Sequence, residues 1–216
     1  MQSELNQALG ETLARIGIVP VLTIESVEAG VGVARALARG GLDLIEVTLR
    51  TPQALEAIRK IREEVPLARV GAGTVLGPEQ ADAAIAAGAR FIVSPGMTPR
   101  LIAAAESWPV PFLPGAVTAS EAMSLADLGY RCLKFFPAEA SGGVGTLKAL
   151  AAPLAGITFC PTGGIDGRNV ESYLATPNVV AVGGSWVAPS EAVRAGDWER
   201  VTVAAKQAAQ LRVNTR

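Results

Sequence analysis

The chain contains no histidine among its 216 residues, and this absence excludes several kinds of chemistry. No Ser-His or Cys-His nucleophile pair can be assembled, and no His-ligated metal site can exist. The sequence also holds no tight cluster of Asp and Glu that would indicate a magnesium site. We therefore expect neither a metal nor another cofactor, and proton transfer is left to carboxylates, lysine, tyrosine, cysteine or water.

Strong net charge and long apolar runs are also missing. The formal net charge is −1, and no stripe of Lys and Arg interleaved with aromatic residues offers a surface for nucleic acid. No apolar run approaches the roughly 20 residues needed to cross a bilayer, and Met1 to Gly10 is polar rather than signal-like. We expect a cytoplasmic protein that acts on a small molecule, with no nucleic acid or membrane partner.

Cysteine is scarce, with only Cys132 and Cys160, and both lie in apolar, strand-like segments. In such a setting cysteine usually behaves as a small buried hydrophobic residue, so we interpret both as structural. The sequence leaves a disulfide between them open. A reduced pair is the preferred interpretation, because the chain shows no secretory signal.

What the chain has in quantity is a repeated alternation of β and α patterns. Short runs of Val, Ile and Leu bounded by Gly or Pro alternate with Ala-rich segments of helical period. The expected strands are 18–24, 42–50, 69–74, 91–94, 111–114, 132–137, 158–162 and 179–183. Eight strands, each followed by a helix-like stretch, predict one (β/α)8 TIM barrel domain over residues 1–216, with an extra N-terminal helix at 4–15. An open doubly wound sheet competes, but the first strand has no glycine fingerprint after it.

Residues typical of helix starts and ends agree with this alternation of strands and helices. Thr51-Pro52 and Thr98-Pro99 each offer an N-cap followed by Pro at the first helical position. Thr118 and Glu121 have the spacing of a capping box. Helix ends are expected at three glycine positions, which are Gly40-Gly41, Gly88 and Gly129.

Lys134 is the only one of the four lysines that lies inside an apolar, strand-like run. Burial disfavours the ammonium form, so a free amine becomes available to attack a carbonyl and form a Schiff base. Lys60, Lys148 and Lys206 fall in helix-like segments, where lysine is normally solvated. Burial alone leaves a second possibility open, namely that Lys134 is a structural amine paired with a buried carboxylate.

Strand parity indicates a carboxylate for this amine. In the second strand the apolar Ile45, Val47 and Leu49 share one face, so Glu46, Thr48 and Arg50 point into the barrel. The same alternation turns Lys134 and Phe136 inward. Lys134 and Glu46 are therefore expected to approach each other near the end of the barrel where the strands finish.

Glycines at three strand ends predict close approach of the backbone to a ligand. Gly71-Ala72-Gly73-Thr74 ends the third strand and adds a hydroxyl. Thr162-Gly163-Gly164 and Gly183-Gly184-Ser185 end the seventh and eighth strands, where barrels of this kind bind phosphate. Asp166 is expected to cap the helix that follows strand seven. Ordinary β-to-α turns are the alternative explanation for the glycines.

Seven stretches spread along the sequence together form a specific pattern. They are Ile18-Val19-Pro20-Val21, residues 46–51 (EVTLRT), 70–75 (VGAGTV), Ser94-Pro95-Gly96, 134–139 (KFFPAE), 160–165 (CPTGGI) and Gly183-Gly184-Ser185-Trp186. In these stretches the chain resembles, almost from end to end, the 2-keto-3-deoxy-6-phosphogluconate (KDPG) and 4-hydroxy-2-oxoglutarate (KHG) aldolase family. The resemblance implies a class I lyase of the Entner–Doudoroff pathway. Such an enzyme splits KDPG into pyruvate and D-glyceraldehyde 3-phosphate and assembles as a homotrimer.

The resemblance also implies a role for each matching residue. Lys134 would form the Schiff base and Glu46 would move protons. Arg50 and Thr74 would hold the pyruvyl carboxylate, and Pro95 and Phe136 would line the pocket. Phosphate would be bound at Gly163, Gly164, Gly184 and Ser185, with Thr162 near the substrate hydroxyls. Thr162 also favours the gluconate substrate over its C4-epimeric galactonate counterpart.

Two other functions fit a barrel with these glycines. A phosphosugar isomerase or synthase would share the glycines of strands seven and eight without requiring a Schiff-base lysine. A non-catalytic phosphosugar-binding barrel would keep Lys134 and Glu46 as a structural pair only. Formation of an imine with pyruvate separates both from an aldolase.

Overall fold

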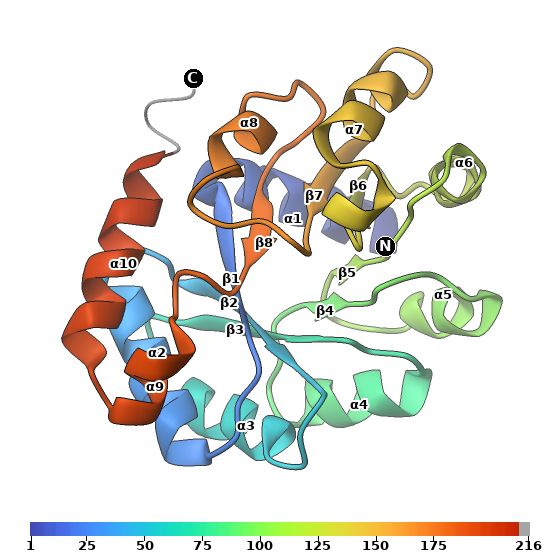
Figure 1. The fold of residues 1–216 in the computed structure, drawn as a ribbon. Helices are drawn as coiled ribbons and strands as arrows, with labels where there is room; N and C mark the ends of the chain where they lie inside the picture. The colour runs from blue at the N-terminus through green and yellow to red at the C-terminus, as the bar shows by residue number, and fades with distance from the viewer. Residues whose placement is uncertain (212–216) are drawn as a thin grey trace.

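Eight parallel strands follow one another around a barrel in the computed structural model, which describes residues 1–211 (Figure 1). Each predicted strand is present, and all eight are shorter than the sequence pattern suggested. The strands are β1 (Ile18–Leu22), β2 (Leu44–Thr48), β3 (Arg69–Gly73), β4 (Ile92–Val93), β5 (Phe112–Leu113), β6 (Cys132–Phe135), β7 (Thr158–Pro161) and β8 (Val182–Gly184). The (β/α)8 prediction is confirmed.

Single residue bridges complete the ring between a six-stranded sheet, β5-β4-β3-β2-β1-β8, and the pair β6-β7. On one side Gly115 bridges Lys134, with the Lys134 N–H donating to the Pro114 carbonyl at 2.8 Å. On the other side Thr162 bridges Gly183. The last strand is later than predicted, because Val179 only bridges Phe159 and continuous pairing with β1 begins at Val182.

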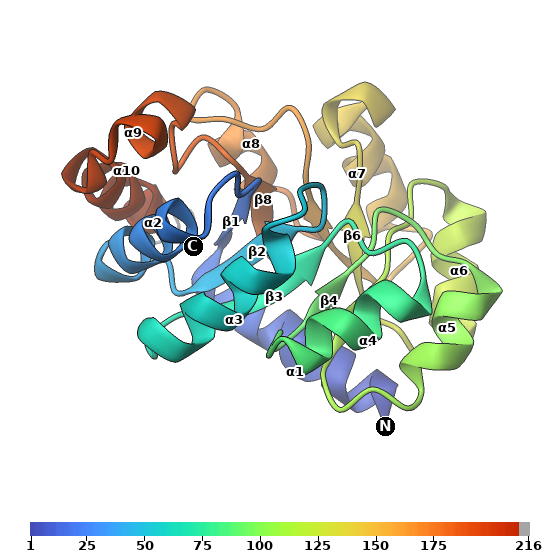
Figure 2. The same cartoon turned by 90° about the horizontal axis from the view of Figure 1, so that it is seen from below.

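Helices cover the outside of the barrel, as Figure 2 shows for the flank formed by α2, α3 and α4. They are α2 (Val27–Arg39), α3 (Ala54–Glu64), α4 (Pro78–Ala86), α5 (Pro99–Ala105), α6 (Ala119–Asp127), α7 (Gly143–Ala151), α8 (Val170–Leu174), α9 (Ser190–Ala195) and α10 (Trp198–Leu211), with a short 3₁₀ turn, η1, at Glu139–Ser141. Ile45 and Val47 pack outward in the core between strands and helices, as the strand parity predicted.

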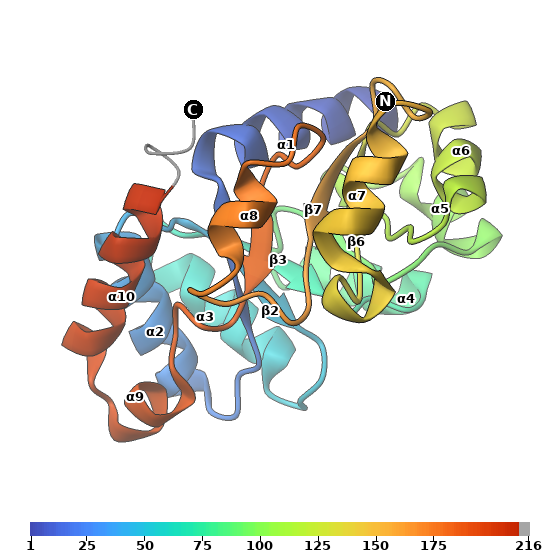
Figure 3. The same ribbon diagram turned by 45° about the horizontal axis from the view of Figure 1, so that its top comes forward.

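The extra N-terminal helix is α1 (Gln2–Ile16), which lies across the end of the barrel where the strands begin (Figure 3). Its buried amides replace strand partners there. Asn6 donates to the carbonyls of Phe112 and Cys132 at 3.0 and 2.8 Å, and its own oxygen accepts from the Cys132 N–H. Leu9 and Leu13 of α1 pack on the apolar side chains that fill this end. The barrel is therefore closed at one end.

Two of the expected helix starts are wrong. Helix α3 begins at Ala54, because the Thr51 hydroxyl donates to the Ile24 carbonyl at 2.5 Å and ties two loops together instead of capping. Helix α8 begins at Val170 and not after Asp166, whose carboxylate accepts from the Arg168 backbone and side chain.

The other helix boundaries follow the sequence. Thr98 caps α5 by accepting from the Leu101 N–H, and Thr118 with Glu121 forms the capping box of α6. Gly41, Gly88 and Gly129 have φ of 91°, 101° and 89°, the left-handed conformation expected where a helix ends. Gly40 differs, with φ −80°, because the left-handed position falls on Gly41.

Candidate active site

Lys134 and Glu46 meet inside the barrel. The Lys134 Nζ donates to Glu46 Oε1 at 3.0 Å and lies 3.4 Å from Oε2. Their side chains are only 6% and 4% exposed. Lys134 comes from β6 and Glu46 from β2, so the two strands bring together residues that are 88 positions apart. The inward parity predicted for both residues is correct.

The position of this pair along the barrel follows from the residues that precede it on each strand. Two residues earlier, Leu44 and Cys132 belong to the apolar cluster at the closed end, together with Cys160 and Phe91. An inward residue two positions later on a strand is one layer further along the barrel. Lys134 and Glu46 therefore form the first charged layer above an apolar floor, which shields them from water on that side.

Gly73 leaves the space that the Glu46 carboxylate occupies. A Cβ at Gly73 would lie 2.0 Å from Glu46 Oε1 and 2.5 Å from its Cδ. A side chain at this position would displace the carboxylate, so glycine at the end of β3 leaves the room in which Glu46 contacts Lys134. The predicted close approach at this strand end is made to a side chain of the protein itself.

Phe136 lies at the boundary between the buried pair and the solvent. Its ring centroid is 5.5 Å from the Lys134 Nζ, and the residue is 38% exposed. An ammonium over an aromatic face is stabilised electrostatically. Phe136 thus has a ring face toward the amine and remains partly exposed to solvent.

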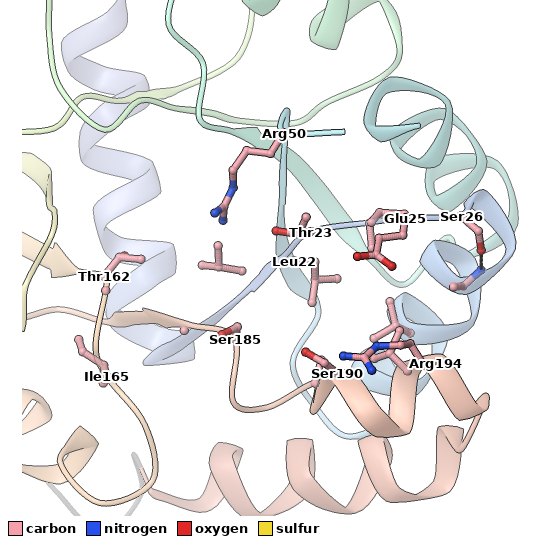
Figure 4. A pocket seen from close by; sticks show the side chains of 18 of the residues that line it. Leu22, Thr23, Glu25, Ser26, Arg50, Thr162, Ile165, Ser185, Ser190 and Arg194 are labelled. Carbon is pink, nitrogen blue, oxygen red and sulfur yellow. Dashed lines mark hydrogen bonds between the residues drawn. The ribbon is translucent and has the colours of Figure 1, made fainter. Parts of the chain in front are cut away.

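A cavity of about 680 Å³ opens at the end of the barrel where the strands finish (Figure 4). Its lining includes seven of the eleven residues predicted from the sequence, which are Arg50, Phe136, Thr162, Gly163, Gly164, Gly184 and Ser185. The rest of the lining comes from the segment 21–26, from α2, from Ile165 and from the segment 188–194. Cavities of 300–1,000 Å³ are typical of small-molecule sites.

Four of the predicted residues do not line this cavity. Lys134 and Glu46 are buried beside it, next to Phe136. Thr74 and Pro95 follow β3 and β4 and are half-buried. Thr74 has φ 59°, the only non-glycine residue with positive φ between residues 1 and 211. A β-branched residue in this conformation is strained, and such strain is concentrated at functional sites.

The Gly163-Gly164 turn has a left-handed backbone and packs against Glu139. Both glycines are left-handed, with φ of 103° and 78°. The Glu139 N–H donates to the Gly163 carbonyl at 3.1 Å, and a Cβ at Gly164 would lie 2.6 Å from Glu139 Cγ. Glu139 in turn accepts from the Tyr173 hydroxyl, and burial together with this hydrogen bond raises the pKa of Tyr173. The turn therefore exposes backbone to the cavity in a fixed conformation.

One wall of the cavity consists of residues that were not predicted from the sequence. Thr23, Glu25 and Ser26 follow β1, and Ser190 and Arg194 belong to α9. The loop after β1 could have been predicted to line the site, because it follows a strand at the end of the barrel where active sites lie. Arg194 has none, since one arginine in a short Ala-rich helix forms no motif.

Three or more His, Cys, Asp or Glu side chains do not come together as a metal site anywhere in residues 1–211. Within the same range, no helix is both long and apolar enough to cross a membrane. Both cysteines are free and buried, so the disulfide that the sequence left open is not formed.

Comparison with known proteins gives a family match and close relatives. The sequence profile described as KDPG and KHG aldolase matches residues 9–204. The 2-dehydro-3-deoxy-phosphogluconate aldolase of Dickeya dadantii (strain 3937) is 50% identical over 191 residues, which cover 88% of this chain and 90% of that protein.

Solved structures superpose over the same length. The KDPG aldolase of Legionella pneumophila, with pyruvate captured at low pH as a covalent carbinolamine intermediate, is 42% identical with a TM-score of 0.89 and covers 92% of this chain and 96% of its own. The aldolase of Zymomonas mobilis ZM4, solved with 3-phosphoglycerate, is 44% identical with a TM-score of 0.87 and covers 93% and 94%. Relatives of this chain thus bind pyruvate and a phosphorylated three-carbon acid.

Proposed function

The chain belongs to the KDPG and KHG aldolase family, and from this membership we propose that it cleaves KDPG into pyruvate and D-glyceraldehyde 3-phosphate through a Schiff base on Lys134. The observation that carries the proposal is the buried contact between Lys134 Nζ and Glu46 Oε1 at 3.0 Å. An amine in this position has a proton partner within reach and little competing water.

The reaction begins with attack of the Lys134 amine on the C2 keto carbon of the substrate. Loss of water from the carbinolamine gives an iminium, which withdraws electrons from the C3–C4 bond. The C4 hydroxyl gives up its proton as that bond breaks, and D-glyceraldehyde 3-phosphate leaves. The pyruvyl fragment remains as a neutral enamine, which is protonated at C3 and then hydrolysed to release pyruvate.

Glu46 is the acid and base in these steps. Its carboxylate contacts the amine directly, so it can take a proton during imine formation and return one during hydrolysis. The C4 hydroxyl and the enamine carbon lie further from the amine, and a water molecule relays the proton to them. One carboxylate suffices because each transfer reverses an earlier one.

Arg50 and Thr74 hold the carboxylate of the pyruvyl group. Arg50 lines the cavity, and within residues 1–211 its guanidinium has no hydrogen bond or ion pair with another side chain. A planar guanidinium binds a carboxylate in two-point fashion and fixes the keto group beside the amine. Pro95 and Phe136 form the apolar sides of this pocket.

The phosphate binds at the ends of β7 and β8. The left-handed turn at Gly163 and Gly164 exposes backbone to the cavity, and Gly184 and Ser185 lie on the neighbouring strand end. Thr162 lies between this region and Phe136 and contacts the substrate hydroxyls. The shorter KHG, which gives pyruvate and glyoxylate, uses the lysine and carboxylate pockets without the phosphate site.

We also propose that the chain forms a homotrimer in the cytoplasm. Exposed apolar side chains support association, among them Leu67, Leu76, Met123 and Leu128. Two buried free thiols suit a reducing compartment. Sedimentation equilibrium at several concentrations measures the mass of the assembly, and a monomer or dimer would exclude the trimer.

Trapping with pyruvate and borohydride tests the aldolase directly. We expect loss of activity and one reduced adduct, located on Lys134 by peptide mass spectrometry. Lys60, Lys148 and Lys206 serve as internal controls within the same chain. An adduct on any of these, or no adduct at saturating pyruvate, would instead favour a phosphosugar isomerase, a synthase or a non-catalytic binding barrel.

A further inference from the structure

The cavity has a second arginine at the wall opposite Arg50. Arg194 belongs to α9, and Figure 4 shows its guanidinium beside Ser190, across the cavity from the guanidinium of Arg50. Arg35, Arg59, Arg69, Arg100 and Arg168 all pair with carboxylates. Arg194 makes no hydrogen bond or ion pair with any side chain of residues 1–211. It is therefore available to a ligand.

The charges around the cavity fit an anion with charge at both ends. Arg50 and Arg194 contribute two positive charges to the lining, and Glu25 contributes one negative charge without forming an ion pair with Arg194. At pH 7 a sugar acid phosphate carries one negative charge on its carboxylate and a charge of about −1.5 to −2 on its phosphate. Two separated guanidinium groups match two separated anions.

Hydroxyl groups lie on the same wall as Arg194. Ser190 precedes Arg194 by four positions in α9, so the two side chains lie on one face of the helix. Ser185, at the end of β8, lies next to them along the wall in Figure 4. The backbone of Gly184 and Gly164 reaches the same cavity. A phosphate between these strand ends and α9 would meet both hydroxyl donors and a cation.

We infer that Arg194, assisted by Ser190, binds the phosphate of the substrate and sets the preference of the enzyme for phosphorylated over unphosphorylated sugar acids. The inference rests on the proposed function for the identity of the substrate. It assigns opposite ends of the cavity to the two arginines, with Arg50 at the carboxylate and Arg194 at the phosphate. The bound substrate then has a single orientation relative to Lys134.

The experiment compares kcat/KM for KDPG with kcat/KM for 2-keto-3-deoxygluconate in the parent, Arg194→Gln, Arg194→Lys and Arg200→Gln. Loss of one charge-assisted hydrogen bond lowers the ratio of the two values about 10- to 100-fold in Arg194→Gln. Arg194→Lys keeps part of the preference. Arg200→Gln removes the same charge from the exposed surface of α10 and leaves the ratio unchanged. An unchanged ratio in Arg194→Gln, or an equal loss for both substrates, overturns the inference.

A binding measurement separates this inference from the aldolase proposal. Inorganic phosphate should raise the Tm of the parent and of Arg200→Gln, and raise it clearly less in Arg194→Gln, whether or not any C–C bond is cleaved. Equal shifts in all three proteins would overturn the role of Arg194. Failure of imine trapping on Lys134 together with a smaller phosphate shift in Arg194→Gln would reject the aldolase and leave the phosphate site standing.

Discussion

The amine of Lys134 lies 3.0 Å from the carboxylate of Glu46 across the interior of the barrel. Taking both charges out of water is expensive, and replacing a buried pair by apolar side chains is often neutral or stabilising. The neighbouring layer of the barrel interior is apolar, because Leu44 and Cys132 occupy the preceding inward positions of the same two strands. A pair that stability does not require supports a chemical role for both residues.

Glu46→Gln should separate proton transfer from simple pairing with the lysine. Gln keeps the shape of the side chain and a hydrogen bond but cannot exchange protons, a function typically contributing 10²–10⁴-fold. We expect a folded protein that loses most of the exchange of pyruvate methyl protons for deuterium in heavy water. NMR of pyruvate measures this exchange, and Glu63→Gln on the exposed face of α3 is the matched control. Exchange at the parental rate would identify another base.

Gly73→Ala should reduce activity through Glu46 without touching the substrate. The new Cβ would lie 2.0 Å from Glu46 Oε1, so the carboxylate must leave Lys134. We expect kcat to fall at least about 10²-fold, as for loss of the base itself. Gly145→Ala in α7 is the control, because its Cβ meets nothing within 4 Å and the change favours the helix by up to about 1 kcal/mol. Full activity in Gly73→Ala would mean that the contact between Glu46 and Lys134 is dispensable.

Barrel parity explains why the chemical core of the site could be predicted from sequence. Inward and outward side chains alternate along a strand. The apolar neighbours of Glu46 and Lys134 face the helices, so both charged side chains were expected to point into the barrel interior and approach each other there. The extra N-terminal helix was also predicted from the helical period of residues 4–15, and in the structure α1 packs Leu9 and Leu13 on the apolar end of the barrel.

Contacts between distant loops explain what could not be predicted. Thr51 and Pro52 have the sequence of a helix start, yet the Thr51 hydroxyl donates to the Ile24 carbonyl of another loop and does not cap a helix. Arg194 reaches the cavity because α9 packs against α2, the helix that follows β1. Local sequence rules hold no information about such tertiary partners.

Removal of the phosphate from the substrate should weaken catalysis strongly. Several charge-assisted hydrogen bonds at the ends of β7 and β8 would be lost, each contributing about 1.5–3 kcal/mol and not fully additive. We expect kcat/KM for 2-keto-3-deoxygluconate to be roughly 10²–10⁴-fold below that for KDPG. Steady-state kinetics with both substrates measures the difference, and a chelator such as EDTA should change neither value. Equal turnover of the two substrates would mean that Gly163, Gly164 and Gly184 only form turns and do not bind phosphate.

The two buried thiols should make the fold sensitive to alkaline pH. Burial raises the pKa of Cys132 to about 12 and raises that of Cys160 further, whereas an unfolded chain ionises cysteine near 8.5. The folded state therefore keeps both protons while the unfolded state releases them. Stability is fully present below about pH 8.5 and falls as pH rises toward 12, by up to about 1.4 kcal/mol per pH unit for each thiol.

Urea unfolding at pH 8, 9 and 10 measures this slope. Burial also raises the pKa of Tyr130 to about 12, so its contribution begins only above pH 10, beyond the measured range. Cys160→Ala should be less stable than the parent at every pH, but its stability should fall about half as steeply between pH 9 and 10. A thiol reagent should modify neither cysteine at pH 8 until the protein unfolds. Rapid modification in the folded state, or a slope unaffected by Cys160→Ala, would show that these thiols ionise in place.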